Sequence, residues 1–214
     1  MKTTPIVAAY VSQPPALTTD YAQKSWQAAT PLSLARNWQG AFSPKPLHTT
    51  ARLIWTNTDL WIGFTCGYSE LDMDAECDAA QERAELWERD VCEAFIQSPA
   101  EASEHSYKEF EVAPTGQWLD VAVHTPREQV DWAWNGGIET SAVVVEATRR
   151  WRAVLKIPFA ALGGPPQAGD EWRANLFRIS RHAGERQFLA FSPTLTEQPD
   201  FHQPSRFVPL RFEA

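Results

Sequence analysis

The segment Glu85–Ile96 combines an aromatic side chain and an isolated carboxylate in a pattern that suits a binding site. Trp87 lies in its polar first half, and the apolar strand-type run Val91–Ile96 contains one acidic residue, Glu93. A strand that is apolar on both faces is typical of the inside of a sandwich or of the space under a second layer. A carboxylate there must be paired, hydrogen-bonded or metal-bound, because burying it alone is very costly. Glu93 is therefore predicted to be either a structural ion-pair partner or a polar group of a site. Trp87 beside it is predicted to be either an aromatic platform or a packed loop residue.

An aromatic platform next to polar groups is the chemistry of sugar binding. The C–H face of a pyranose packs on indole, and the sugar hydroxyls need charged or amide partners to offset their desolvation. The competing interpretation for Glu93 is a buried ion pair, with Arg178 as the first candidate partner. Asn175 and Arg178 indicate either a structural network or the edge of a site. Trp132 and Trp134 predict either a second aromatic surface or core packing.

The strands that position these residues follow from apolar alternation and turn residues. Thr50–Trp55 and Leu60–Cys66 form a predicted hairpin, and Leu60, Ile62 and Phe64 share one face of it. A short surface helix is predicted at about residues 78–86 and a single helical turn at Pro158–Gly163. Further strands are predicted at Ile6–Val11, Tyr107–Val112, Trp118–Val123, Val130–Trp134 (with Val130, Trp132 and Trp134 on one face), Ile138–Glu146, Trp151–Ile157, Glu171–Ile179, Gln187–Phe191 and Phe207–Phe212.

Short strands with turn signals every 8–14 residues, and hardly any helix-period pattern, predict an all-β fold. The expected architecture is an antiparallel β-sandwich of the immunoglobulin or jelly-roll type with short helical turns in its loops. The 214 residues show no shift in composition, so residues 1–214 are predicted to form a single domain.

Composition excludes several classes of partner. The net charge is −8 without a Lys/Arg cluster, which argues against nucleic acid and anionic lipid. The chain contains no long uncharged apolar run, so no membrane span is predicted. The N-terminal residues are a poor secretion signal, which leaves localisation open. Three cysteines without metal-type spacing predict buried free thiols rather than a disulfide framework.

The acidic stretch before Trp87 partly matches the ligand spacing of a helix–loop–helix calcium site. Asp72, Asp74 and Glu76 have the spacing of the first ligands, but Cys77 stands at the turn-glycine position and Arg83 at the position of the bidentate glutamate. A solvated acidic loop is the better prediction, and a looser calcium site in a sandwich loop stays open.

Taken together, several segments resemble one known family over nearly the whole chain. The resemblance is to the family 9 carbohydrate-binding modules and their wider relatives, the DOMON-like β-sandwiches. The matching segments, in order, are Ala51–Trp55 with Leu60–Phe64, Leu86–Phe95, Tyr107–Gly116, Ile157–Gly163, Gly169–Arg178, Ala190–Thr194 and Phe201–Phe207.

This resemblance implies a non-catalytic sugar binder with a sandwich fold that can carry structural calcium. In that family two aromatic side chains clamp a terminal sugar while charged and amide groups bind its hydroxyls. The first aromatic and its acidic partner correspond to Trp87 and Glu93. A basic residue is expected on the strand that here reads Lys108-Glu109, and the second aromatic is expected in the C-terminal loop.

The ligand-binding residues predicted from the family and from the pattern together are Trp87, Glu93, Lys108, Glu109, Asn175, Arg178, Phe201 and His202. Phe201 and His202 occupy the C-terminal region where a tryptophan is expected. His202 is predicted either to line the site or to be an ordinary surface residue. Carbohydrate is the expected partner, and family members are often extracellular or periplasmic.

Three other functions remain as alternatives. A glycoside hydrolase would take two carboxylates from Asp90, Glu93, Glu109 and Glu111, but the chain lacks the nucleophile-elbow, zinc-protease and phosphate-loop motifs. A haem-binding DOMON-like domain needs an axial ligand such as Met, and the one internal methionine, Met73, lies in the acidic loop, so no haem is expected. The third alternative function is an interaction domain without a sugar ligand.

Overall fold

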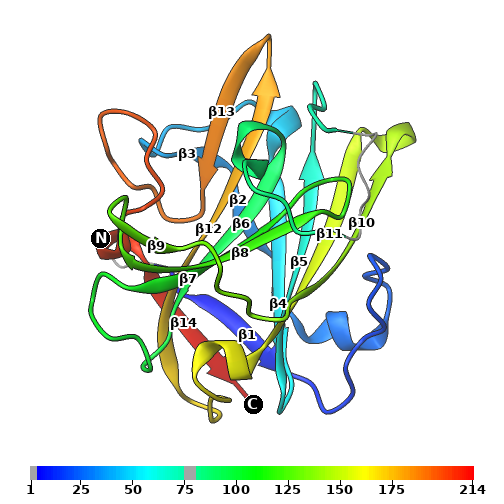
Figure 1. The fold of residues 1–214 in the computed structure, drawn as a ribbon. Coiled ribbons are helices and arrows are strands. Elements are labelled where there is room, and N and C mark those ends of the chain that lie inside the picture. Colours follow the sequence, from blue (N-terminus) through cyan, green and yellow to red (C-terminus); the bar gives the residue numbers. More distant parts are fainter. Residues whose placement is uncertain (1–3, 75–80) are drawn as a thin grey trace.

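The computed structural model describes residues 4–74 and 81–214, and these residues are almost entirely β-structure (Figure 1). The strands are β1 (Ile6–Tyr10), β2 (Leu32–Leu34), β3 (Arg36–Asn37), β4 (Thr49–Trp55), β5 (Asp59–Gly67), β6 (Val91–Gln97), β7 (Tyr107–Val112), β8 (Trp118–Thr125), β9 (Gln129–Asp131), β10 (Glu139–Val145), β11 (Arg150–Pro158), β12 (Glu171–His182), β13 (Glu185–Ala190) and β14 (Val208–Glu213). Between them lie short 3₁₀ turns, which are η1 (Lys24–Ala28), η2 (Lys45–Leu47), η3 (Leu86–Glu88), η4 (Glu146–Thr148), η5 (Phe159–Leu162) and η6 (Pro204–Arg206). The prediction of an all-β fold is confirmed. No helix among the described residues is long and apolar enough to cross a membrane.

The strands form one continuous sheet that curls into two facing layers. Its main path runs β10-β11-β5-β4-β1-β14-β12-β6-β7-β8-β9. The pairing is antiparallel except at β1, which pairs in parallel with β4 and with β14 and so joins the two layers. Cys66 of β5 and Cys92 of β6 are not sheet neighbours, yet their Sγ atoms lie 3.3 Å apart, which shows that the layers pack face to face. Both thiols are free and buried, as predicted, and Cys77 lies outside the described residues.

The strand β6 is buried along its whole length because both of its faces are covered. Cys92, Ala94 and Ile96 point into the main core between the layers. Val91 and Phe95 point to the opposite face, into a second apolar cluster. By alternation Glu93 shares this second face. The predicted strand with two apolar faces is therefore confirmed, and Glu93 belongs to its outer face.

The C-terminal loop covers part of this outer face. Phe201 stacks on Phe177 of β12 with ring centroids 4.2 Å apart. Phe207 packs edge-on against Tyr107 at 5.2 Å. Because the loop covers only part of the outer face of β6, β7 and β12, the remainder forms the floor of a cavity.

Two local predictions have opposite outcomes. The predicted turn at Pro158–Gly163 is confirmed as η5, and Gly163 ends it with φ +89°, a conformation that glycine adopts without strain. The predicted helix at about residues 78–86 is wrong over residues 81–86, where only Leu86, the first residue of η3, is helical. Residues 78–80 of the predicted helix lie outside the described residues. Glu85 has a left-handed backbone, φ +64°, which a continuing right-handed helix does not allow.

Candidate functional site

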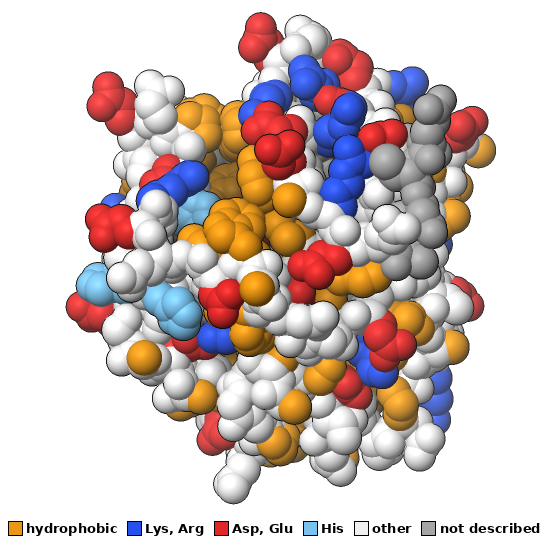
Figure 2. Space-filling model, viewed as in Figure 1, with side chains coloured by type: hydrophobic (Ala, Val, Ile, Leu, Met, Phe, Trp, Pro, Cys, Tyr) orange, Lys and Arg blue, Asp and Glu red, His pale blue; other side chains and the backbone are white. Residues whose placement is uncertain are grey.

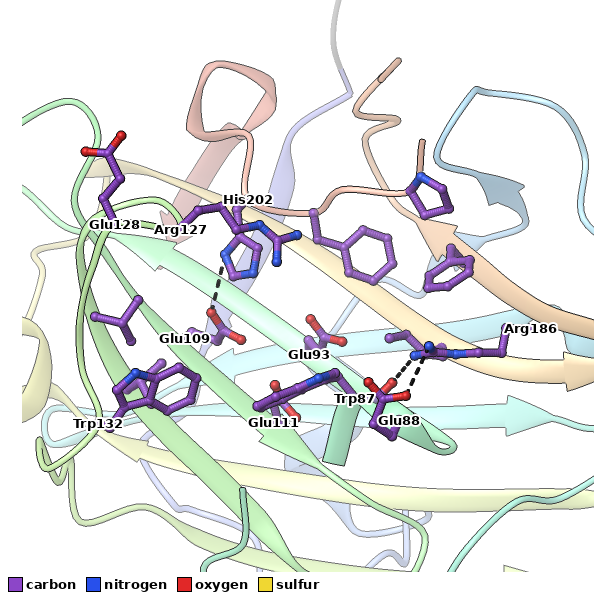
Figure 3. A pocket seen from close by; sticks show the side chains of 16 residues that line it. Trp87, Glu88, Glu93, Glu109, Glu111, Arg127, Glu128, Trp132, Arg186 and His202 are labelled. Carbon is purple, nitrogen blue, oxygen red and sulfur yellow. Dashed lines mark hydrogen bonds and ion pairs between the residues drawn. The ribbon is translucent and has the colours of Figure 1, made fainter. Parts of the chain in front are cut away.

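A cavity of about 530 Å³ opens over the outer face of β6 and β7. Its lining includes a pair of tryptophans, five glutamates, two arginines and a histidine. Figure 2 shows the hollow, with hydrophobic side chains inside it and a histidine and charged side chains close to its rim. In Figure 3 the carboxyl groups of Glu93, Glu109 and Glu111 lie between Trp87 and Trp132 on one side and Arg127 and His202 on the other.

Trp87 and Trp132 form an aromatic wall. Their ring centroids are 5.9 Å apart with the planes inclined by 44°, and Trp132 is 56% exposed. Trp87 is placed by η3, whose Leu86 is buried in the outer cluster. Arg186 of β13 donates to the backbone oxygen of Trp87 and lies 3.3 Å from the carboxylate of Glu88, so it ties the turn to the β12–β13 hairpin. The two rings present a continuous apolar surface rather than two faces of a clamp.

Glu93, Glu109 and Glu111 form the polar floor of the cavity. Glu93 on β6 pairs directly with Glu111 on β7, and Glu109 is two residues away on the same face of β7. The three side chains are 0 to 6% exposed, and one carboxyl oxygen of each lies within 4.8 Å of the others. Among the described residues, no donor outside this cluster reaches either oxygen of Glu111 or Oε1 of Glu93.

Burial dominates the electrostatics of this floor. Desolvation raises the pKa of Glu93 and of Glu111 well above the ordinary value, and the neighbouring carboxylates raise both pKa values further. Desolvation also raises the pKa of Glu109, to about 7, although its hydrogen bond with Glu111 opposes the shift. Arg127 and Arg186 lie at the rim, but each is held by an acid of its own, Asp200 at 2.7 Å and Glu88 at 3.3 Å.

His202 contributes a neutral ring to the opposite wall. Its Nδ1 is 2.5 Å from the hydroxyl of Tyr107 and 3.8 Å from Oε2 of Glu109. Desolvation lowers the pKa of His202 to about 4, and the charge of Arg127 acts in the same direction. The imidazole is therefore uncharged at neutral pH, and its contact with Glu109 is not a salt bridge despite the short distance.

A sequence model described as carbohydrate family 9 binding domain-like matches residues 20–207. The chain belongs to this family. The match covers most of the chain and confirms the resemblance that the segments above predict.

Solved structures with the same architecture support this family 9 assignment at the level of the fold. A putative carbohydrate-binding protein from Bacteroides uniformis aligns with a TM-score of 0.76 and 17% identity, over 98% of this chain and 99% of its own. A family 9 carbohydrate-binding module from Caldicellulosiruptor kristjanssonii, solved in complex with cellotriose, aligns at 0.70 and 12% identity, over 99% and 94%. The same module in complex with glucose gives the same TM-score and identity, over 99% and 96%. No curated protein gives a significant match.

The structure brings together five of the eight predicted ligand-binding residues of this family 9 domain. Trp87, Glu93, Glu109, Phe201 and His202 all line the cavity. Phe201 contributes less than a clamp would, because it is 6% exposed and is stacked on Phe177.

The other three predicted residues lie elsewhere. Lys108 points to the opposite face of β7, where its Nζ is 2.9 Å from Glu101, so it does not supply a basic group to the cavity. Asn175 hydrogen-bonds the backbone of Ser192 with both ends of its amide. Strand alternation turns Lys108 away from the cavity. Asn175 shares the outer face with Phe95, but its amide is held by Ser192 and it does not line the cavity.

The predicted ion pair between Arg178 and Glu93 is wrong. Arg178 pairs in register with Cys92, so its side chain enters the space between the layers. There it lies 3.1 Å from the carboxylate of Asp90 and also donates to the backbone oxygens of Leu47 and Gly67. It is a structural residue that is fully buried.

Other residues that line the cavity were either not predicted from the sequence or were predicted with two alternative roles. Trp132 was predicted to be a second aromatic surface or a core residue, and it is exposed beside Trp87. Trp134 instead packs edge-on against Phe110 at 6.0 Å, so the predicted common face of the two tryptophans is wrong. Glu111 was identifiable from the alternation Tyr107, Glu109, Glu111, but Arg127 and Arg186 carry no sequence signal that places them at the rim.

The acidic loop does not fit calcium over its described part. The two carboxylate oxygens of Asp72 are engaged by Arg89 at 2.7 Å and Arg181 at 2.6 Å. Asp74 is 2.8 Å from Arg83. Since guanidinium groups already hold these oxygens, a cation would have to displace them. Glu76 lies outside the described residues.

Proposed function

We propose that this family 9 domain binds a terminal sugar or a short oligosaccharide in the cavity between the Trp87–Trp132 wall and His202. The aromatic wall beside buried carboxyls is the observation that carries the proposal, because indole rings pack on the C–H face of a pyranose and carboxyls bind its hydroxyls. The ring packs on the indoles, and its hydroxyls meet the floor. The cavity volume of about 530 Å³ suits a mono- or disaccharide.

The relatives support the same class of ligand. The Caldicellulosiruptor kristjanssonii module was solved with cellotriose and with glucose. A glucose-type ring is therefore the first ligand to test.

Binding without catalysis is part of the proposal. Glycoside hydrolases hold their two carboxyl groups about 5–5.5 Å apart when they retain configuration and about 6.5–9.5 Å apart when they invert it. The carboxyl oxygens of the floor lie within 4.8 Å of one another and all on the same side of the cavity. The three floor carboxyls therefore do not flank a bound sugar ring from opposite sides.

Isothermal calorimetry with glucose and cellotriose tests the proposal. Saturable binding is expected, and Trp87→Ala is expected to weaken it about tenfold or more with the fold intact. Phe42→Ala is the matched control, since Phe42 is 73% exposed and lies outside the cavity lining. Chromatography of cellotriose after incubation should show no hydrolysis product. Normal binding by Trp87→Ala would mean that the site lies elsewhere.

A further inference from the structure

The floor of the cavity has the wrong charge balance for a site that only accepts neutral sugar hydroxyls. Glu93, Glu109 and Glu111 are all acidic, and among the described residues no ion pair joins any of them to a lysine or arginine. Glu111 is fully buried, and no donor outside the cluster reaches its oxygens from residues 4–74 or 81–214. Buried carboxyls without donors are rare, because each forfeits hydrogen bonds that water supplied in the unfolded chain.

We propose that the preferred ligand is a cationic sugar, a pyranose with a free ammonium group that Glu93, Glu109 and Glu111 receive while the ring packs on Trp87 and Trp132. This inference rests on the proposed function and names the class of sugar. It assigns a role to the unpartnered carboxyl oxygens and to the aromatic wall together, since both line the same cavity.

The geometry of the floor matches an ammonium group. An ammonium nitrogen has three hydrogens to donate, and each carboxyl offers an acceptor. Donors at about 2.8 Å in tetrahedral directions place the acceptor oxygens roughly 4.6 Å apart. The three carboxyl oxygens lie within 4.8 Å of one another, which accommodates this arrangement.

The electrostatics favour a single positive charge. Burial raises the pKa of all three glutamates, that of Glu109 to about 7, so the empty floor favours protonated carboxyls more than exposed glutamates do. An arriving ammonium stabilises the ionised carboxylates, so binding is expected to release protons. The indole faces beside the floor also attract a cation through their negative π-faces.

A divalent metal ion is the competing occupant of the same carboxyls. Calcium takes six to eight oxygen ligands, and the clustered carboxyls of the floor come from three glutamates. The aromatic wall contributes the rings of Trp87 and Trp132, which supply no oxygen ligand to a metal ion. A bare ion would also leave the aromatic wall without a function, whereas an amino sugar uses it.

Calorimetry at pH 7 with glucosamine, glucose and N-acetylglucosamine tests the inference on the unmodified protein. These sugars share a ring and differ at one substituent, which is charged only in glucosamine. Glucosamine is expected to bind about tenfold or more tightly than the other two. Repeating the titration in buffers with different ionisation enthalpies should reveal proton release with glucosamine alone. Equal affinity for glucose and glucosamine would overturn the inference while leaving the proposed function standing, and no binding of these three sugars or of cellotriose would overturn both.

Variants separate the floor from the rim. Glu109→Gln and Glu111→Gln keep the side-chain shape and should abolish the preference for glucosamine over glucose. Glu128→Gln is the matched control, because Glu128 is an exposed acid at the rim of the same cavity. Titration with CaCl₂ alone tests the competing occupant. Calcium binding that is lost in Glu111→Gln, with no preference for glucosamine, would identify a metal site and refute the cationic-sugar assignment.

Discussion

Glu93 on β6 lies directly opposite Glu111 on β7, and both carboxyls are buried beneath the same cavity. Two opposed carboxyls in a sheet repel each other when both are ionised, so burial and this repulsion raise both pKa values. Burying a carboxyl without hydrogen-bond donors lowers stability in either protonation state. The same strands could place apolar residues here, as they do at the neighbouring Phe95. The floor therefore lowers the stability of the domain in exchange for a preformed polar site.

Removing one carboxylate of this pair should stabilise the domain. Glu111→Gln is expected to raise the free energy of unfolding by about 1 kcal/mol at pH 8, because it ends the repulsion between opposed carboxylates. At pH 5 the gain should shrink, since the lower pH and the raised pKa values of Glu93 and Glu111 both favour the uncharged carboxyls. Urea unfolding at both pH values measures this, with Glu128→Gln as the exposed control. A variant that is less stable than wild type at pH 8 would contradict the picture of a repulsive floor.

The pH dependence of stability should follow the raised pKa of Glu109. Its folded pKa, about 7, exceeds the unfolded value of roughly 4.3, so the folded state binds more protons between these values. Its contribution is complete below the unfolded pKa and is lost as pH rises through 7, by on the order of 3 kcal/mol.

The test of this contribution needs a difference measurement. His202 has a lowered pKa of about 4 and acts in the opposite direction, because stability from a neutral buried histidine is lost as pH falls from about 6.5. Asp200, Arg127, Tyr107 and the other floor glutamates also face these groups. Unfolding free energies of wild type minus Glu109→Gln from pH 5 to 8 isolate Glu109. A flat difference would show that Glu109 has an ordinary pKa.

The fold class could be predicted because, in each strand, the alternation of apolar residues indicates which side chains face the core. The two faces of β6, with Cys92, Ala94 and Ile96 on one and Val91 and Phe95 on the other, were readable as a strand buried on both sides. The register between neighbouring strands could not be predicted from the sequence. A shift of one residue reverses the face of a side chain, and the register that sets Arg178 opposite Cys92 turns it away from Glu93.

The aromatic wall could not be predicted for a related reason. Alternation holds only while the chain stays in a strand, and β9 ends at Asp131. Beyond it Trp132 and Trp134 diverge, one toward Trp87 and the other toward Phe110. Contacts between loops that are distant in sequence, such as Trp87 with Trp132, leave no periodic signal.

This divergence predicts different effects for the two tryptophans. Trp132→Ala should weaken sugar binding about tenfold and hardly change the thermal midpoint, because Trp132 is 56% exposed. Trp134→Ala should lower the free energy of unfolding by about 2 kcal/mol, since Trp134 packs against the main core. Calorimetry and thermal unfolding of both variants check this. Unchanged sugar affinity in Trp132→Ala would remove Trp132 from the site.

The ion pair between Arg178 and Asp90 should be the most sensitive polar contact of the fold. Asp90 also accepts a hydrogen bond from Ser180 at 2.9 Å, and both partners of the pair have fully buried side chains. Asp90→Ala leaves the guanidinium of Arg178 buried without its counter-ion, and a loss of about 3–5 kcal/mol is expected.

The surface pair of Glu171 with Arg211 is the matched control, because both of its side chains are half exposed. Glu171→Gln should cost less than about 1 kcal/mol. The double variant Asp90→Ala/Arg178→Met should recover part of the loss, since it removes the unpaired charge. Urea unfolding of the three variants measures these changes in the free energy of unfolding. Similar losses for Asp90→Ala and Glu171→Gln would refute the prediction that the buried pair is the more sensitive one. Neither Asp90 nor Arg178 lines the large cavity, so the sugar affinity of the folded fraction should match that of the wild type.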